Sequence, residues 1–133
     1  MTTRANGTFD VKIIAQEDPQ LNDPTMSRLT LDKQFHGDLE ATSKGQMLAA
    51  GNPASGSGGY VAIEKVSGKL QGRSGTFVLQ HFGTMDRGKM ELNVHVVPGS
   101  GTDQLTGLSG KMSIQIDNGK HFYELEYSLA EAS

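Results

Sequence analysis

The sequence predicts an all-β protein: an eight-stranded antiparallel barrel, closed or nearly closed, with mostly meander connections. Apolar residues recur at every second position along most of the 133 residues, which is the period of a half-buried strand. Most of the 17 glycines lie with other turn-forming residues between the alternating runs, as tight turns require. Strands with one apolar face must close or stack to bury it, and closure also removes the exposed edges of the sheet.

The alternating runs can be followed in chain order, and together they give about eight strands. They cover residues 9–13, 29–36, 39–43, 59–67, 77–82, 90–96, 112–117 and 120–129. Two segments between them, 16–25 and 50–59, are less regular. The second is rich in glycine and serine, so we expect a mobile loop at one rim of the barrel. The length fits a single domain over residues 1–133.

Asn118-Gly119 stands between the last two runs. This dipeptide is favoured in two-residue hairpin turns because both turn residues need positive φ. The runs 112–117 and 120–129 should therefore pair as a tight hairpin. Succinimide formation is an alternative explanation for the same dipeptide, but the hairpin turn already accounts for it.

The pattern Leu-x-Gly-x-Ser-Gly occurs at residues 70–75 and again at 105–110. Each copy leads into an alternating run. We interpret both as glycine-enabled corners where a strand enters the barrel. A phosphate cradle is the alternative, but neither copy has the spacing of a P-loop or precedes a helix.

Composition and charge exclude several classes of function. Without cysteine there is no disulfide framework, thiol nucleophile or thiolate metal site. The net charge is −3 and no basic run occurs, so nucleic acid is not an expected partner. Apolar runs are far shorter than a membrane span needs, and the first residues carry no signal-peptide pattern. A soluble cytoplasmic protein, without membrane contact, is the expectation.

Four histidines are the first candidates for chemistry. His36 and His95 are out of phase with the apolar positions and should be exposed, whereas His81 and His121 are in phase and should point inward. An inward histidine is more often a hydrogen-bonded core residue than a catalyst. Since neither His-x-His nor HExxH is present, no metal site and no cofactor is expected.

Glu64 shares its phase with Tyr60 and Val66, in a run whose opposite face carries Val61 and Ile63. Both faces of this strand are thus partly apolar, as at a subunit interface. A glutamate at a rim or interface is the favoured interpretation, ahead of a catalytic one. A nucleophilic serine is not indicated, because the Gly-x-Ser-x-Gly elbow is missing.

Three segments together resemble a known family: residues 35–43, residues 59–81, and residues 105–110 with 121–127. The family consists of small bacterial proteins classed as a domain of unknown function, with a fold similar to the allene oxide cyclase barrel. The resemblance extends from about Gly7 to Leu129. It implies an eight-stranded antiparallel barrel and a homodimer. The similarity to allene oxide cyclase itself is one of fold, and no catalytic residue is carried over.

The leading functional hypothesis is a barrel that binds a small apolar or amphipathic ligand, since barrels of about eight strands can hold one small molecule. One alternative is an isomerase or cyclase with His81 or Glu64 as acid or base. The other is a purely structural dimer with a filled interior. The candidates to line or plug the interior are Tyr60, Glu64, Phe77, His81, Met90, His121, Tyr123 and Tyr127.

Overall fold

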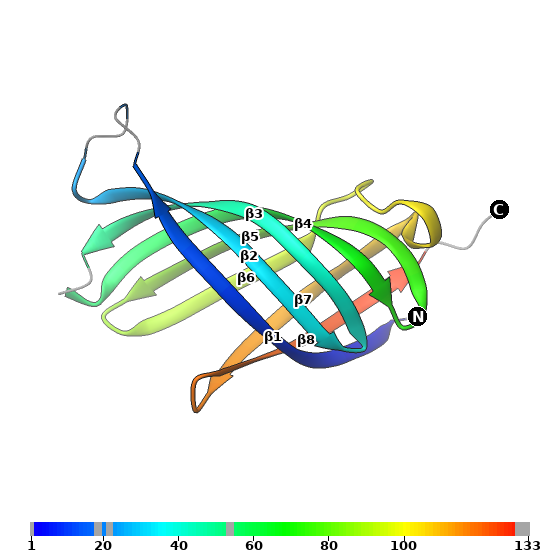
Figure 1. The fold of residues 1–133 in the computed structure, drawn as a ribbon. Helices are drawn as coiled ribbons and strands as arrows, with labels where there is room; N and C mark the ends of the chain where they lie inside the picture. The colour runs from blue at the N-terminus through cyan, green and yellow to red at the C-terminus, as the bar shows by residue number, and fades with distance from the viewer. Residues whose placement is uncertain (1, 18–19, 21–22, 53–54, 130–133) are drawn as a thin grey trace.

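The computed structural model describes residues 2–17, 20, 23–52 and 55–129. Within them the chain forms eight strands and one short 3-10 helix (Figure 1). The elements are β1 (Thr3–Gln16), β2 (Met26–Gly37), β3 (Leu39–Asn52), β4 (Ser57–Leu70), β5 (Arg73–Asp86), β6 (Lys89–Val96), η2 (Asp103–Leu105), β7 (Leu108–Asp117) and β8 (Lys120–Leu129).

The strands form a closed barrel in sequence order, and β8 returns to pair with β1. Every neighbouring pair is antiparallel, so the predicted closed meander is confirmed. The hairpin of β7 and β8 is also confirmed, with φ of 50° at Asn118 and 78° at Gly119. Gly72 and Gly107, one from each copy of the repeated pattern, have φ of 85° and 83° at turns before a strand, as expected for corners.

The loop expected at residues 50–59 is much shorter than predicted. Ala50 pairs with Gly59 and Asn52 with Ser57, so both flanks of this segment extend the ladder of β3 and β4. Residues 53–54 lie outside the described residues. The prediction was wrong because small residues are poor strand formers on average, whereas here they allow close approach: a Cβ on Gly51 would lie 2.5 Å from the Cα of Gly58.

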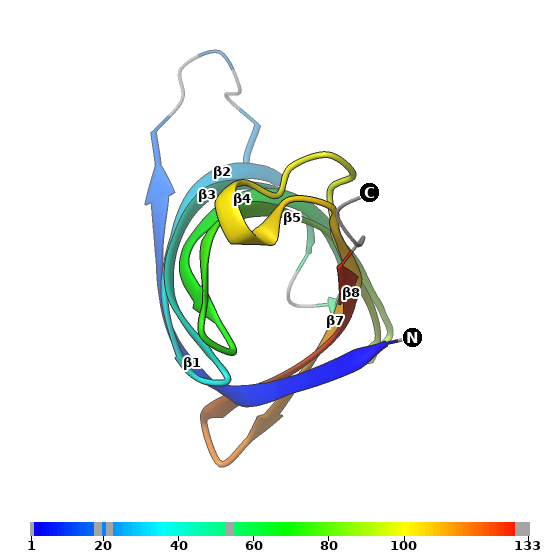
Figure 2. The same ribbon diagram turned by 90° about the vertical axis from the view of Figure 1, so that its right-hand side faces the viewer.

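One end of the barrel is filled by side chains. Phe35, Leu39, Leu70, Phe77 and Leu125 are fully buried there. The loop with η2 lies at this end, nearest the viewer in Figure 2, and its Leu105 is also buried. The filled end is therefore a compact apolar plug.

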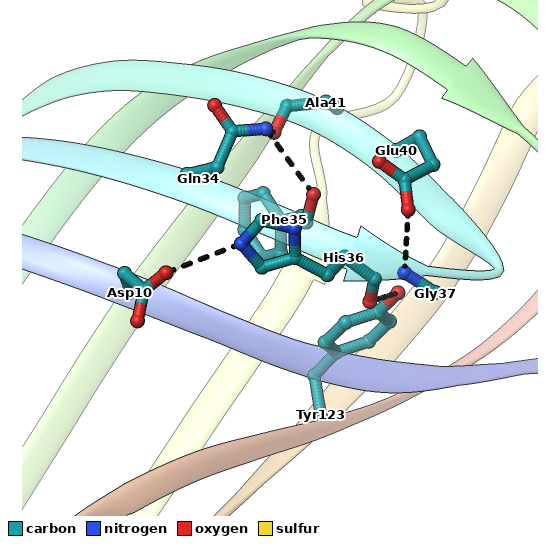
Figure 3. A network of polar contacts seen from close by, with 8 residues as sticks. All are labelled: Asp10, Gln34, Phe35, His36, Gly37, Glu40, Ala41 and Tyr123. Carbon is teal, nitrogen blue, oxygen red and sulfur yellow. Dashed lines mark hydrogen bonds and ion pairs between the residues drawn. The ribbon is translucent and has the colours of Figure 1, made fainter.

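Tyr123 fastens this end by its hydroxyl (Figure 3). The hydroxyl donates to the carbonyl of His36 and accepts from the amide of Leu39, both at 2.9 Å. These two residues flank the β2–β3 turn. A residue of β8 thereby holds a turn 84 positions earlier in the chain.

The seam between β6 and β7 is the weakest junction of the barrel. The two strands share only the pairs Val94 with Met112 and His95 with Lys111, whereas β3 and β4 pair along their whole length. Beyond Val94 and Met112 the strands separate, and the β7–β8 hairpin projects away from the β5–β6 hairpin (Figure 1). The part of the seam where the two strands are separated lies at the end of the barrel opposite η2.

Candidate functional site

The barrel is hollow at the end opposite η2. A partly open cavity of about 470 Å³ lies there, a volume within the usual range of small-molecule sites. Its walls are largely apolar and come from every strand. They consist of Phe9, Val11, Ile13, Leu31, Lys33, Met47, Ala49, Gly58, Gly59, Tyr60, His81, Gly83, Thr84, Met85, Met90, Glu91, Leu92, Ile114, Ile116 and His121.

The inner part of this cavity contains a buried ion pair. The ammonium of Lys33 lies 3.2 Å from Oε1 and 3.1 Å from Oε2 of Glu64. Lys33 is 6% exposed and Glu64 0%, so both charges are removed from bulk water. Ser43 donates a third contact to Oε2 at 3.3 Å. The ammonium also lies 4.9 Å from the ring centroid of Phe9, a favourable cation–π arrangement.

His81 makes the other contact with Glu64. Its Nε2 lies 3.2 Å from Oε1, yet the atom has no partner with the geometry of a hydrogen bond. The side chain is 2% exposed and lines the cavity. A buried polar atom without a hydrogen bond is costly, so this nitrogen is held near a carboxylate in an arrangement that a ligand or an added proton can improve.

Two groups at the site have shifted pKa values. Burial raises the pKa of the Glu64 carboxyl, but His81 and Lys33 together lower the pKa by a larger amount. The net shift is therefore downward, and the carboxylate is ionised. Burial, and then the charge of Glu64, raise the pKa of Tyr60. Tyr60 therefore remains a neutral hydrogen-bonding group in the cavity wall.

The eight sequence-derived candidates fall into three places. Tyr60, His81, Met90 and His121 line the cavity. Glu64 lies behind Lys33 and His81 and is not part of the wall. The remaining candidates, Phe77, Tyr123 and Tyr127, are buried in the apolar core. The expectation of a rim or interface position for Glu64 was wrong, because its register opposite Gly45 and Leu79 turns it into the barrel.

Sequence reasoning missed Lys33 and Ser43, the two further members of the polar cluster. A usable signal existed, because Lys33 has the same phase as Leu31 and Phe35, and Ser43 continues the series of Leu39 and Ala41. Inward-pointing charge in a strand is uncommon, which would have marked Lys33. The expected directions of the histidines are confirmed: His36 and His95 are exposed, while His81 is buried and His121 half-buried.

Half-exposed apolar side chains also gather on the outer surface of β3, β4 and β5. Leu48 lies opposite Val61, and Val61 opposite Phe82, across three adjacent strands. Ile63 follows two positions along β4, and each of the four is about half exposed. These four residues are called the β4 face below.

Two further features do not occur in the described part of the chain. It holds no group of three or more His, Asp or Glu side chains placed to bind a metal ion. Nor does it contain a helix that is long and apolar enough to cross a membrane.

Comparison with known proteins gives a family and a structural relative. Residues 5–127 match the model of a family described as proteins of unknown function, DUF3224. A solved structure of a DUF3224 protein of unknown function from Shewanella oneidensis MR-1 is 48% identical, with a TM-score of 0.92. That match covers 99% of this chain and 100% of the other. No curated protein matches the chain. The expected resemblance to a bacterial family of unknown function is confirmed, and the chain belongs to the DUF3224 family.

Proposed function

We propose that this protein binds one small amphipathic molecule in the cavity at the hollow end of the barrel. The observation that carries the proposal is the combination of an apolar wall with a buried cluster of Lys33, Glu64 and His81 at its inner part. An apolar cavity with a few placed polar groups is the usual composition of a small-molecule site. A cavity of about 470 Å³ is large enough for one small molecule.

The hollow end counts against a purely structural protein with a filled interior. A structural barrel gains stability by filling its core, because empty volume costs dispersion contacts. Here the filling side chains are confined to one end, and the other end keeps both its volume and a buried ion pair. Two buried charges rarely stabilise a fold more than apolar residues of the same size would. Retention of this ion pair beside a cavity is therefore better explained by a ligand than by stability.

Native mass spectrometry of the freshly purified protein tests this function. We expect a small molecule to be bound noncovalently. After this molecule has been removed, an apolar fluorescent probe should bind with a stoichiometry of one per chain. The matched variants are Leu31→Trp, which fills the cavity, and Leu129→Trp, at the other end of the barrel. Loss of binding in the first variant and not in the second supports the proposal. A wild-type protein that neither retains a small molecule nor binds the probe overturns it.

A second candidate function is acid–base catalysis of an isomerase or cyclase type. It is favoured by the 3.2 Å contact between His81 Nε2 and Glu64 Oε1 in a cavity that a substrate could fill. A carboxylate beside an imidazole orients the ring and stabilises its protonated form. This candidate predicts that the ligand recovered from His81→Ala differs in structure from the one recovered from wild type. Recovery of the same ligand from both proteins would contradict catalysis and support binding without a reaction.

The proposal includes a cytoplasmic homodimer. The β4 face has an apolar residue on each side of Val61, namely Leu48 of β3 and Phe82 of β5. An isologous dimer requires one patch that is complementary to itself, and a second copy of this chain meets that requirement. The resemblance to the allene oxide cyclase barrel supports the same assembly and the use of the barrel interior.

A further inference from the structure

The polar cluster presents positive charge to the cavity and keeps its negative charge behind. Lys33 and His81 are part of the cavity wall, whereas Glu64 is not. A molecule inside the cavity therefore meets an ammonium and an imidazole before it meets the carboxylate. An amine at the inner end of the ligand would face the like charge of Lys33, which is unfavourable in a buried site.

One carboxylate serves two groups that can each carry a positive charge. Glu64 lies 3.1 Å from the Lys33 ammonium and 3.2 Å from His81 Nε2. With the imidazole neutral, the cluster has no net charge. Nε2 of His81 has no hydrogen-bond partner in the structure. With the imidazole protonated, the cluster gains one positive charge that nothing in the apolar wall balances. A monovalent anion in the cavity would balance it.

Resting on the proposed function, we propose that the ligand is a monocarboxylate with an apolar tail, bound with its carboxylate next to Lys33 and His81. The imidazole takes up one proton from solvent as the anion binds. Lys33, with three donors, can contact both the ligand and Glu64. The apolar tail then lies toward the open end, along residues such as Met47, Met85 and Met90.

The surroundings of His81 determine how binding depends on pH. Glu64 and Tyr60 face it from β4, and Lys33 faces the same cluster from β2. Glu91 of β6 and His121 of β8 line the same cavity. Among the described residues, Glu64 is the only carboxylate that forms an ion pair with His81. Proton uptake at His81 should therefore dominate, so affinity for the carboxylate falls as pH rises.

Calorimetric titration with decanoate, methyl decanoate and decanol separates the outcomes. Measured from pH 5.5 to 8.5, decanoate should bind about tenfold or more tightly than either neutral compound. Near the upper end of this pH range, where an ordinary imidazole is neutral, repeating the titration in buffers of different ionisation enthalpy should show uptake of about one proton per decanoate bound. His81→Gln should abolish that uptake, whereas His95→Gln, which changes an exposed imidazole outside the cavity wall, should retain it.

The two proposals fail in different ways. If the neutral compounds bind in the cavity as tightly as decanoate, or if no proton is taken up, the carboxylate inference is overturned while the binding function stands. If none of the three compounds binds, and none displaces an apolar probe, the proposed function fails as well. The comparison of ligands uses the wild-type protein, so it does not depend on the folding of any variant.

Discussion

The ring of Tyr60 lies directly against the backbone of Gly83, and both residues form part of the cavity wall. A Cβ placed on Gly83 would lie 2.7 Å from Cε1 of Tyr60, closer than van der Waals contact permits. The glycine therefore provides the space that the tyrosine ring occupies. The size of one residue on β5 sets the position of an aromatic wall contributed by β4.

Gly83→Ala should push the Tyr60 ring out of place and weaken binding of an apolar ligand by about tenfold. The matched control is Gly59→Ala, which also adds a methyl group to the cavity wall. At Gly59 the nearest atom to the new Cβ is 3.4 Å away, so little should change. Probe fluorescence measures affinity, and thermal unfolding verifies that both variants fold. Equal affinity of the two variants would contradict the prediction.

Tyr123→Phe should lower the free energy of unfolding by about 1–3 kcal/mol, because it leaves the buried amide of Leu39 without its acceptor. Tyr127→Phe is the control. Its hydroxyl donates to the side chain of Gln71, which is exposed and can turn to water. Its loss should cost about 1 kcal/mol or less. Urea unfolding of both proteins provides the comparison, and a larger effect at Tyr127 would show that the β2–β3 turn does not depend on Tyr123.

The stability of the protein should fall in acid partly through Glu64. The pKa of this carboxyl is lowered in the folded state, so its contribution is complete above the ordinary value of 4.5 and is lost as pH falls through the lowered value. Glu64→Gln should therefore flatten the dependence of unfolding free energy on pH in that acidic range. At neutral pH the variant should lose about 3–5 kcal/mol, because Lys33 is left with an unpaired buried charge.

The control for this experiment is Glu124→Gln, which breaks the exposed pair with Arg4. Exposed ion pairs contribute little, so its pH dependence should match that of the wild type. Should Glu64→Gln also follow the wild-type curve, the acid sensitivity would have to come from other carboxyls.

Replacement of apolar residues on the β4 face should dissociate the proposed dimer. Val61→Ser and Phe82→Ser should each shift the solution mass toward that of a monomer, since truncated side chains at an interface centre weaken association most. Phe122→Ser removes an exposed apolar side chain from β8, away from this face, and should leave the mass unchanged. Light scattering after size-exclusion chromatography measures the masses. A monomeric wild type would refute the dimer directly.

The sequence was sufficient for the barrel because its information is local. Alternation decides which side chains point inward, and Asn118-Gly119 decides how β7 turns into β8. The phase of Glu64 and His81 was readable in the same way. The sequence does not show how far along the barrel axis an inward side chain lies, which is called its depth here. Phe77 and Tyr123 share that inward phase, yet they lie in the apolar plug and not in the cavity. Depth depends on the stagger of strands around the closed barrel, which no single strand encodes. The contacts of Glu64 with Lys33 and Ser43 join three strands and depend on the same stagger.

The barrel is closed only weakly between β6 and β7, so this seam is the place where the barrel can open most easily. Only two residue pairs close it, and they lie at the inner end of the slit, so the hollow end can widen by bending at Val94 and Met112. Such bending would break no other ladder of the barrel. Ligands of different width could then share one cavity.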